Sequence, residues 1–145
     1  MGTVREILAK KGAQVWTVGK NATVLQAALL MNDHRVGALV VLEDERVAGI
    51  FSERDVLQRI VAGERDPART TVGEVMTSDV VCGTLDTSIE EARGAMKNRR
   101  IRHLPLVDDD RRLLGLVSIG DLNAYQADGQ EQTIHMLHEY LYGRT

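Results

Sequence analysis

The chain carries one pattern twice, and this repeat limits its fold more than any other feature of the sequence. Residues 36–57 and residues 101–123 each contain an apolar run, an acidic turn, a second apolar run with a glycine, and then Ser-x-x-Asp. With the residues that precede it, each copy is about 65 residues long. The matched positions are Gly49, Ser52 and Asp55 in the first copy and Gly115, Ser118 and Asp121 in the second.

A unit of this size leaves too much apolar surface exposed to fold alone. Hydrophobic residues make up 43% of the 145 residues, which is enough for a core and argues against disorder as the main state. We therefore expect the two copies to pack face to face and to close one core. We expect the first copy with its lead-in to span residues 1–65, the second to span residues 66–128, and a C-terminal helix and tail to span residues 129–145.

Each copy contains an amphipathic helix. Residues 23–32 carry apolar side chains at positions i, i+3, i+4 and i+7, which predicts a helix with one buried face, and residues 88–98 follow the same pattern. Thr23 and Ser88 stand at the first positions, where a side-chain oxygen accepts a hydrogen bond from a free N–H group of the first turn. The sequence therefore predicts one capped helix in each copy.

Short apolar runs around the acidic turns indicate a β-hairpin in each copy, followed by a second helix. A further helix over residues 131–141 lies outside the repeat and is a candidate packing or dimer element. The predicted strands are 38–42 with 47–51 and 104–107 with 113–117, and the predicted second helices are 52–62 and 118–127.

Composition and charge exclude several classes of protein. The net charge is −3 at pH 7, whereas a dedicated nucleic-acid binder usually has a basic surplus. The longest apolar stretch, residues 36–42, falls far short of the roughly 20 residues that a membrane-spanning helix needs. The single Cys82 excludes an internal disulfide framework. We expect a cytoplasmic protein with no nucleic-acid partner and no membrane contact.

A duplicated β-α-β-β-α unit that ends in Gly-apolar-apolar-Ser-x-x-Asp resembles the CBS domain pair, a module named after cystathionine β-synthase. The segments GIFSERDVL, RIRHLPLVDDD and GLVSIGDL carry the resemblance, which covers roughly residues 4–127. It implies an α+β fold in which two repeats form a pseudo-twofold disc, here with an added C-terminal helix. It also implies two clefts that bind adenosine-containing ligands, and discs that stack as a homodimer.

The resemblance places Ser52 with Asp55, and Ser118 with Asp121, as the two ligand-binding pairs. An aspartate near a helix start can accept hydrogen bonds from both ribose hydroxyls, and the first free N–H groups of the helix favour an anion such as phosphate. The same spacing is also a capping box, in which both side chains only fix the helix end. One copy alone favours capping, two matched copies favour binding, and the two roles can coexist.

The basic cluster at residues 99–103 is the most asymmetric feature of the repeat. In the resembling family, basic residues here contact ligand phosphate in the cleft of the other repeat. By that match Arg102 and His103 face the Ser52–Asp55 cleft, and Arg54 and Arg100 are further candidates. The alternative is a solvated arginine run that suits the helix dipole.

The other cleft contains fewer charged candidates. Gly37 and Ala38 take the place of the basic pair there, and charge has to come from Lys10 and Lys11. We therefore expect the Ser52–Asp55 cleft to bind a phosphorylated adenosine more tightly than the Ser118–Asp121 cleft. For the adenine base, the resemblance indicates Met76, Thr77 and Asp79 in the first cleft, Gly12 and Ala13 in the second, and Val36 and Ile101 along the base.

Other signals carry less weight. His135 and His138 lie on one face of the last predicted helix, but further metal ligands are not evident, and we expect no metal site. Cys82 fits a buried inert thiol, since no histidine partner is suggested. Trp16 fits packing better than stacking on a base. No arrangement of acids, histidines or nucleophiles indicates catalysis, and we expect no enzyme.

Two functions remain. The first is a sensor that binds AMP foremost, or ATP, ADP or NAD, and signals to an unidentified regulated protein through a homodimer. The second is a structural dimerisation module with non-functional clefts. The retained Ser, Asp and basic residues favour the first.

Overall fold

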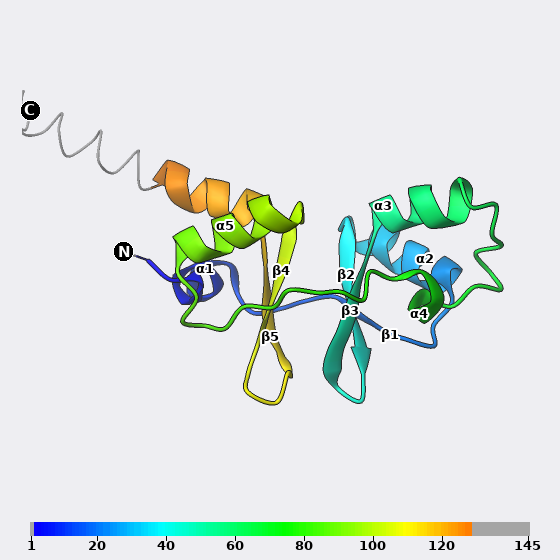
Figure 1. The fold of residues 1–145 in the computed structure, drawn as a ribbon, viewed down its shortest axis with the longest axis horizontal. Helices are drawn as coiled ribbons and strands as arrows, with labels where there is room; N and C mark the ends of the chain where they lie inside the picture. Colours follow the sequence, from blue (N-terminus) through cyan, green and yellow to red (C-terminus); the bar gives the residue numbers. More distant parts are fainter. Residues whose placement is uncertain (1, 129–145) are drawn as a thin grey trace, which may run out of the picture.

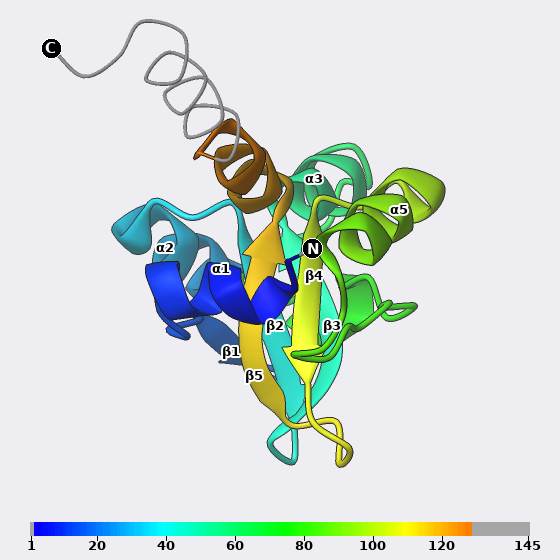
Figure 2. The same cartoon turned by 90° about the vertical axis from the view of Figure 1, so that its left-hand side faces the viewer.

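Two β-hairpins lie beside each other at the centre of the molecule, and helices cover their outer sides (Figure 1). The structure is a computed structural model that describes residues 2–128. Both hairpin turns point to the same end of the molecule (Figure 2). All four predicted strands are confirmed to within two residues at each end. They are β2 (Ala38–Glu43), β3 (Arg46–Ser52), β4 (His103–Val107) and β5 (Leu113–Ser118).

The first copy forms a three-stranded sheet and the second a two-stranded one. β1 (Thr17–Gly19) pairs in parallel with β2, so that Thr17 lies opposite Val40. In the second copy the equivalent segment makes only a single parallel bridge, between Gly83 and Leu106. The predicted β-α-β-β order is complete in the first copy and shortened in the second. The α+β class and the two-repeat arrangement are confirmed.

The predicted caps fix the start of the amphipathic helices α2 (Val24–His34) and α5 (Ile89–Arg99). The Thr23 and Ser88 hydroxyls each accept a hydrogen bond from the backbone N–H three residues later. The side chain of that later residue in turn accepts from the backbone N–H of the cap. Both helices therefore begin with a complete capping box, which satisfies two otherwise free N–H groups.

Two short helices that the sequence analysis does not predict precede the repeats: α1 (Val4–Lys11) and α4 (Val72–Val75). α1 lies against the second hairpin and α4 lies with the first copy (Figure 1). Each lead-in segment therefore crosses to the hairpin of the other copy. The buried α1 residues Val4, Ile7 and Leu8 share a core with Ala92, Met96, Leu104, Leu106, Val117 and Leu122.

The hydrophobic interior consists of three clusters where we expected one. Side chains alternate along a strand, so each hairpin has two faces. In β2, Leu39 and Val41 point into the cluster under the helices, whereas Val40 points into a small cluster where the two hairpins meet. Cys82 packs against this central cluster, and burial raises the pKa of its thiol, although Arg111 opposes the effect. This thiol therefore stays protonated at neutral pH, which fits the inert thiol that the sequence predicts.

One predicted helix has a different form. Residues 52–62 form α3 (Glu53–Asp55) followed by a π-helix, η1 (Val56–Val61), in which the Ala62 N–H donates to the carbonyl of Leu57. The wider turns of the π-helix lie beside a tertiary contact. The Arg59 guanidinium donates hydrogen bonds to two carbonyls at the end of α4. In the second copy residues 119–128 are helical, close to the predicted range. The predicted helix over residues 131–141 lies outside the described residues.

The crossing lead-in segments explain the glycine of each repeated motif and give a first prediction. A Cβ on Gly49 would lie 2.7 Å from the backbone carbonyl oxygen of Thr77, whereas one on Gly115 would lie 2.6 Å from Cδ1 of Leu8, a side chain that can shift more easily than backbone can. We expect Gly49→Ala to lower the free energy of unfolding by about 1–3 kcal/mol, and Gly115→Ala to lower it less. Urea denaturation checks this.

Gly94 supplies the control, because it lies inside α5 and a Cβ there would meet nothing within 4 Å. Gly94→Ala is expected to stabilise the chain by about 0.5–1 kcal/mol, since alanine loses less backbone entropy in a helix. Equal losses for Gly49→Ala and Gly94→Ala would contradict the role given to the crossing segment.

Candidate functional site

Both copies of Ser-x-x-Asp form a capping box at a strand-to-helix junction. The Ser52 N–H donates to Asp55 Oδ2 over 2.9 Å, and the Ser118 N–H donates to Asp121 Oδ2 over 2.8 Å. In return each aspartate N–H donates to the serine Oγ. The capping interpretation is thus correct in both copies. A binding role depends on what else each carboxylate contacts.

In the first copy the carboxylate is closed off. Asp55 is 5% exposed, and besides its cap it accepts hydrogen bonds from Ser52 Oγ and, at 3.2 Å, from Thr77 Oγ1. The Thr77 backbone exchanges two hydrogen bonds with Ile50, which fixes this segment over the motif. Arg59 adds a cation 3.9 Å from Asp55 Oδ1. Neighbouring protein groups therefore already occupy both oxygens.

In the second copy a lysine side chain takes the place of this segment. Lys11, the last residue of α1, places its Nζ 2.7 Å from Asp121 Oδ2 and 3.0 Å from the carbonyl oxygen of Leu116. Leu116 follows the motif glycine, as Ile50 does in the first copy. The Asp121 side chain keeps 24% of its surface exposed. The two clefts thus differ in kind: a threonine whose backbone is bonded to Ile50 closes one, and a long lysine side chain spans the other.

The charge state of Asp121 follows from these contacts. Burial, the largest single influence, raises its pKa. The hydrogen bonds from Lys11 and Ser118 and the positive charge of Lys11 outweigh burial and hold the pKa below its usual value. Asp121 is therefore ionised at neutral pH and acts only as a hydrogen-bond acceptor.

A pocket of about 290 Å³ opens beside Ser118. Residues from both copies line it, as expected for a cleft between repeats. The predicted members are Lys11, Val36, Gly37, Ala38 and Ser118. His103 also lines it, although we expected it in the other cleft. The members that the sequence analysis did not assign to a cleft are Gln14, Val15, Trp16 and Leu116.

The missed residues Gln14, Val15 and Trp16 lie between α1 and β1. We predicted the neighbouring Gly12 and Ala13 as contacts of the base in this cleft, but they are not among the residues that line the pocket. The Trp16 ring stacks on that of His34 with centroids 3.5 Å apart. Trp16 therefore packs, as expected, and also faces the pocket. The position of Trp16 directly before strand β1 is the sequence feature that could have identified it as a pocket residue.

The position of His103 corrects the expected cleft assignment. His103 begins β4 and lies opposite Ser118, which ends β5, so both belong to the second cleft. In an antiparallel hairpin the first residue of one strand pairs with the last residue of the other. Arg102 is exposed, and its carbonyl accepts a hydrogen bond from Ile119 N–H beside the same motif. The expectation that Arg102 and His103 face Ser52 and Asp55 is not supported.

His103 is neutral at physiological pH. Burial is the main cause that lowers its pKa, and the charges of Lys11 and Arg102 lower it further, while Asp121 acts in the opposite direction. The unperturbed pKa of histidine is about 6.5, so its imidazole carries little charge at pH 7.

The other predicted residues are spread around the disc. Met76 and Thr77 lie at the first motif, as expected: the Met76 side chain faces Gly49, and Thr77 contacts Asp55. Asp79 instead forms an exposed ion pair with Arg99. Lys10 pairs with Asp128, Ile101 packs against the second core, Arg54 is exposed, and Arg100 ends α5 with a left-handed backbone.

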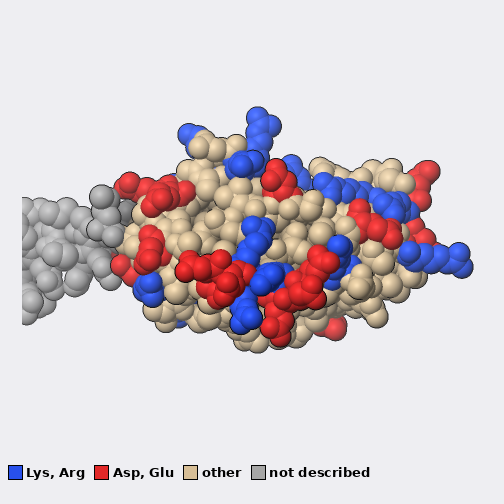
Figure 3. Space-filling view, turned by 60° about the horizontal axis from the view of Figure 1, so that its bottom comes forward, with Lys and Arg blue, Asp and Glu red and all other residues tan. Residues whose placement is uncertain are grey.

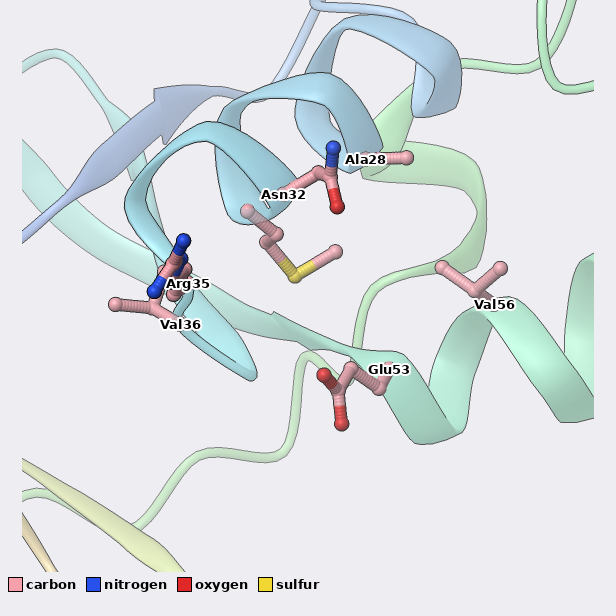
Figure 4. A pocket seen from close by; sticks show the side chains of 7 residues that line it. Ala28, Asn32, Arg35, Val36, Glu53 and Val56 are labelled. Atoms are coloured by element: carbon pink, nitrogen blue, oxygen red, sulfur yellow. The ribbon is translucent and has the colours of Figure 1, made fainter.

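A second pocket, of about 470 Å³, lies between α2 and the start of α3 and η1. Figure 4 shows Asn32 and Arg35 from the end of α2 on one side and Glu53 and Val56 on the other. Sequence reasoning does not identify this pocket. Its lining residues are Ala28, Met31, Asn32, Arg35, Val36, Glu53 and Val56.

The surface shows no single sign of charge on the face in Figure 3, where acidic and basic side chains alternate. Within residues 2–128 no group of three His, Cys, Asp or Glu side chains could hold a metal ion. His135 and His138 lie outside the described residues. In the part of the chain that the structure describes, the helices lack the length and apolar character needed to cross a membrane.

Comparisons with known proteins agree with this fold. The family model described as CBS domain matches residues 4–62 and 72–128. The CBS domain-containing protein YhcV of Bacillus subtilis is 38% identical over 130 residues, which is 90% of this chain and 89% of that protein. The crystal structure of CBS domain NE2398 is 35% identical with a TM-score of 0.82, over 88% of this chain and 99% of that one.

A further solved structure, that of Hypoxic Response Protein I, is 30% identical with a TM-score of 0.75, over 86% of this chain and 99% of that chain. That structure contains two coordinated zinc ions. The zinc ions are a property of that protein.

Proposed function

The chain belongs to the CBS-domain family, and on this premise we propose that it is a regulatory module that binds an adenosine nucleotide in the Ser118–Asp121 cleft. A bound nucleotide would then signal to a partner protein. The observation that carries the proposal is the open pocket beside a partly exposed, ionised carboxylate with a lysine amine at its edge.

The pocket, together with Asp121 next to it, offers a partner for each part of the ligand. Asp121 can accept hydrogen bonds from the ribose hydroxyls, and Lys11 supplies a positive charge for phosphate. Gly37 and Ala38 keep the wall small, so the ligand can approach the backbone. Trp16 and Val36 supply apolar surface for the base.

The size of the pocket favours the smallest nucleotide. Its volume of about 290 Å³ lies at the lower end of the roughly 300–1,000 Å³ typical of ligand pockets. We therefore propose AMP ahead of ADP, ATP and NAD. We propose the first cleft as the weaker one, which reverses the order that the basic cluster suggested, because both oxygens of the buried Asp55 carboxylate already accept hydrogen bonds from protein groups.

The alternative is a structural module whose Ser-x-x-Asp motifs only cap helices, and both caps are formed. A thermal-shift screen with AMP, ATP, NAD and adenosine separates the two. A ligand that binds only the folded state stabilises it by about 2.7 kcal/mol at a hundredfold excess over its Kd. We expect AMP to give the largest shift. No shift with any of these compounds would favour the structural module.

The partner in assembly is proposed to be a second copy of this chain. Apolar side chains of α2 and η1 stand exposed on either side of the 470 Å³ pocket: Leu25, Leu29, Leu57 and Val61, with exposed fractions of 42–64%. A twofold dimer is the commonest way to cover such a self-complementary face.

We expect Leu29→Asp and Leu57→Asp each to weaken this dimer at least about tenfold. Burial of a leucine side chain is worth about 1.5–3 kcal/mol, and a buried charge would add to the loss. Light scattering at micromolar concentration measures it, with the exposed Asn98→Asp on α5 as the charge-matched control. A wild-type chain of monomer mass, 16.0 kDa, would contradict the proposed dimer.

A further inference from the structure

We propose that Lys11 is a phosphate-dependent latch: it bonds Asp121 and moves to the phosphate when a nucleotide enters. This inference rests on the proposed function and deepens it, because it makes the cleft select nucleotides over nucleosides. Lys11 and an incoming ribose would compete for the same carboxylate oxygen. The oxygen that Lys11 occupies, Asp121 Oδ2, is one of the two that a ribose diol would use.

Asp121 Oδ2 already accepts hydrogen bonds from two protein donors. It accepts the Ser118 N–H at 2.8 Å and Lys11 Nζ at 2.7 Å. A ribose that donates one hydroxyl to each carboxylate oxygen must therefore compete with the lysine. A nucleoside gives nothing in exchange for displacing it. A nucleotide offers its phosphate, which carries more negative charge than the carboxylate and can accept several hydrogen bonds.

The lysine can move at small cost. Its side chain is 36% exposed, and exposed ion pairs are weak in water because solvent screens them. It is also the last residue of α1, followed by Gly12 with a φ of +90°. The rest of α1 stays in place, since Val4 and Ile7 are buried in the second core and Glu6 accepts a hydrogen bond from Tyr125 at 2.7 Å.

The first copy shows that the latch is a special feature of one cleft. There Thr77 Oγ1 donates a hydrogen bond to Asp55, and the backbone N–H and carbonyl of Thr77 each form a hydrogen bond with the backbone of Ile50. The long side chain near Asp55, that of Arg59, donates to two carbonyls at the end of α4 and stays 3.9 Å from the carboxylate. In the second cleft a long side chain bonds the aspartate directly, so an incoming ligand can exchange this partner of the aspartate for another.

Calorimetry on the full chain tests the latch with AMP and adenosine as probes. Lys11→Met keeps the length of the side chain and removes its charge. We expect this variant to bind AMP at least about tenfold more weakly, because a charge-assisted hydrogen bond is lost. The same variant is expected to bind adenosine more tightly than wild type does, because nothing competes for Asp121. Lys97→Met, an exposed substitution on α5, is the control and should change neither.

The outcomes separate the latch from the proposed function. Should Lys11→Met weaken AMP and adenosine by the same factor, the lysine only supports the cleft and the latch is wrong. Should AMP binding stay unchanged, the lysine is no phosphate ligand. Failure of the wild-type chain to bind either probe would overturn the proposed function itself. Unfolding curves of each variant show whether a lost signal reflects lost folding.

Discussion

Asp121→Ala is expected to abolish tight AMP binding, whereas Asp55→Asn is expected to leave it almost unchanged. Asp121 is partly exposed and bonded to Lys11 and Ser118, which line the pocket, although it does not line the pocket itself. On the proposed function, its loss removes the acceptor for the ribose hydroxyls. A hydrogen bond to a charged group is worth about 1.5–3 kcal/mol, so losing one costs about tenfold or more in affinity and losing two costs correspondingly more. Asp55 already bonds Ser52 and Thr77, so it has little to offer a ligand.

Calorimetry with AMP and with adenosine measures both variants. Both probes contain the ribose diol, so Asp121→Ala should weaken each of them. A tight event that survives Asp121→Ala and disappears in Asp55→Asn would place the ligand in the first cleft, as the basic cluster at residues 99–103 suggested. A tight event that survives both substitutions would mean that the two motifs are helix caps alone.

The elements that the sequence predicted well are those fixed by local chemistry. Thr23 and Ser88 form the caps expected of them because a capping box needs only residues three apart in the chain. The strands also depend on nearby residues, because each strand follows its own apolar run. The position of His103 could also have been deduced. Once two strands form a hairpin, their ends must pair, and this rule puts His103 beside Ser118.

The remaining features depend on contacts between distant segments. Val4, Ile7 and Leu8 have the spacing of a helix face, yet the sequence does not reveal that this face covers the hairpin of the other copy. The same crossing brings Lys11 to Asp121, 110 residues further along the chain. The π-helix over residues 56–61 likewise accompanies a contact that Arg59 makes with a distant segment.

The crossing also explains why two copies of one motif have diverged in chemistry. Each motif aspartate meets the lead-in of the other copy. α4 is short, and the chain after it runs along the first motif, so Thr77 bonds both Ile50 and Asp55. α1 is twice as long, and the second motif meets its final side chain instead. The length of a helix thus decides whether a cleft is closed or open.

Asp55→Ala is expected to be the most destabilising single change at either motif. The carboxylate caps α3, and such a loss costs about 0.5–2 kcal/mol. Its removal also leaves the hydroxyl of Thr77 without its acceptor in a partly buried site, where the loss costs at most about 1–3 kcal/mol. We therefore expect the free energy of unfolding to fall by about 2–4 kcal/mol, as measured by urea denaturation at one protein concentration.

Asp121→Ala is the matched comparison, since it removes the same residue from the same motif in the other copy. It gives up a cap and an ion pair with a partly exposed lysine, and exposed pairs contribute only about 0–1 kcal/mol. Its loss of stability should therefore be the smaller of the two, although its loss of ligand affinity should be the larger. This opposite ranking is the signature of one aspartate that holds the fold and one that remains available to a ligand. If Asp121→Ala proved the more destabilising, the assignment of the open cleft to the second copy would be wrong.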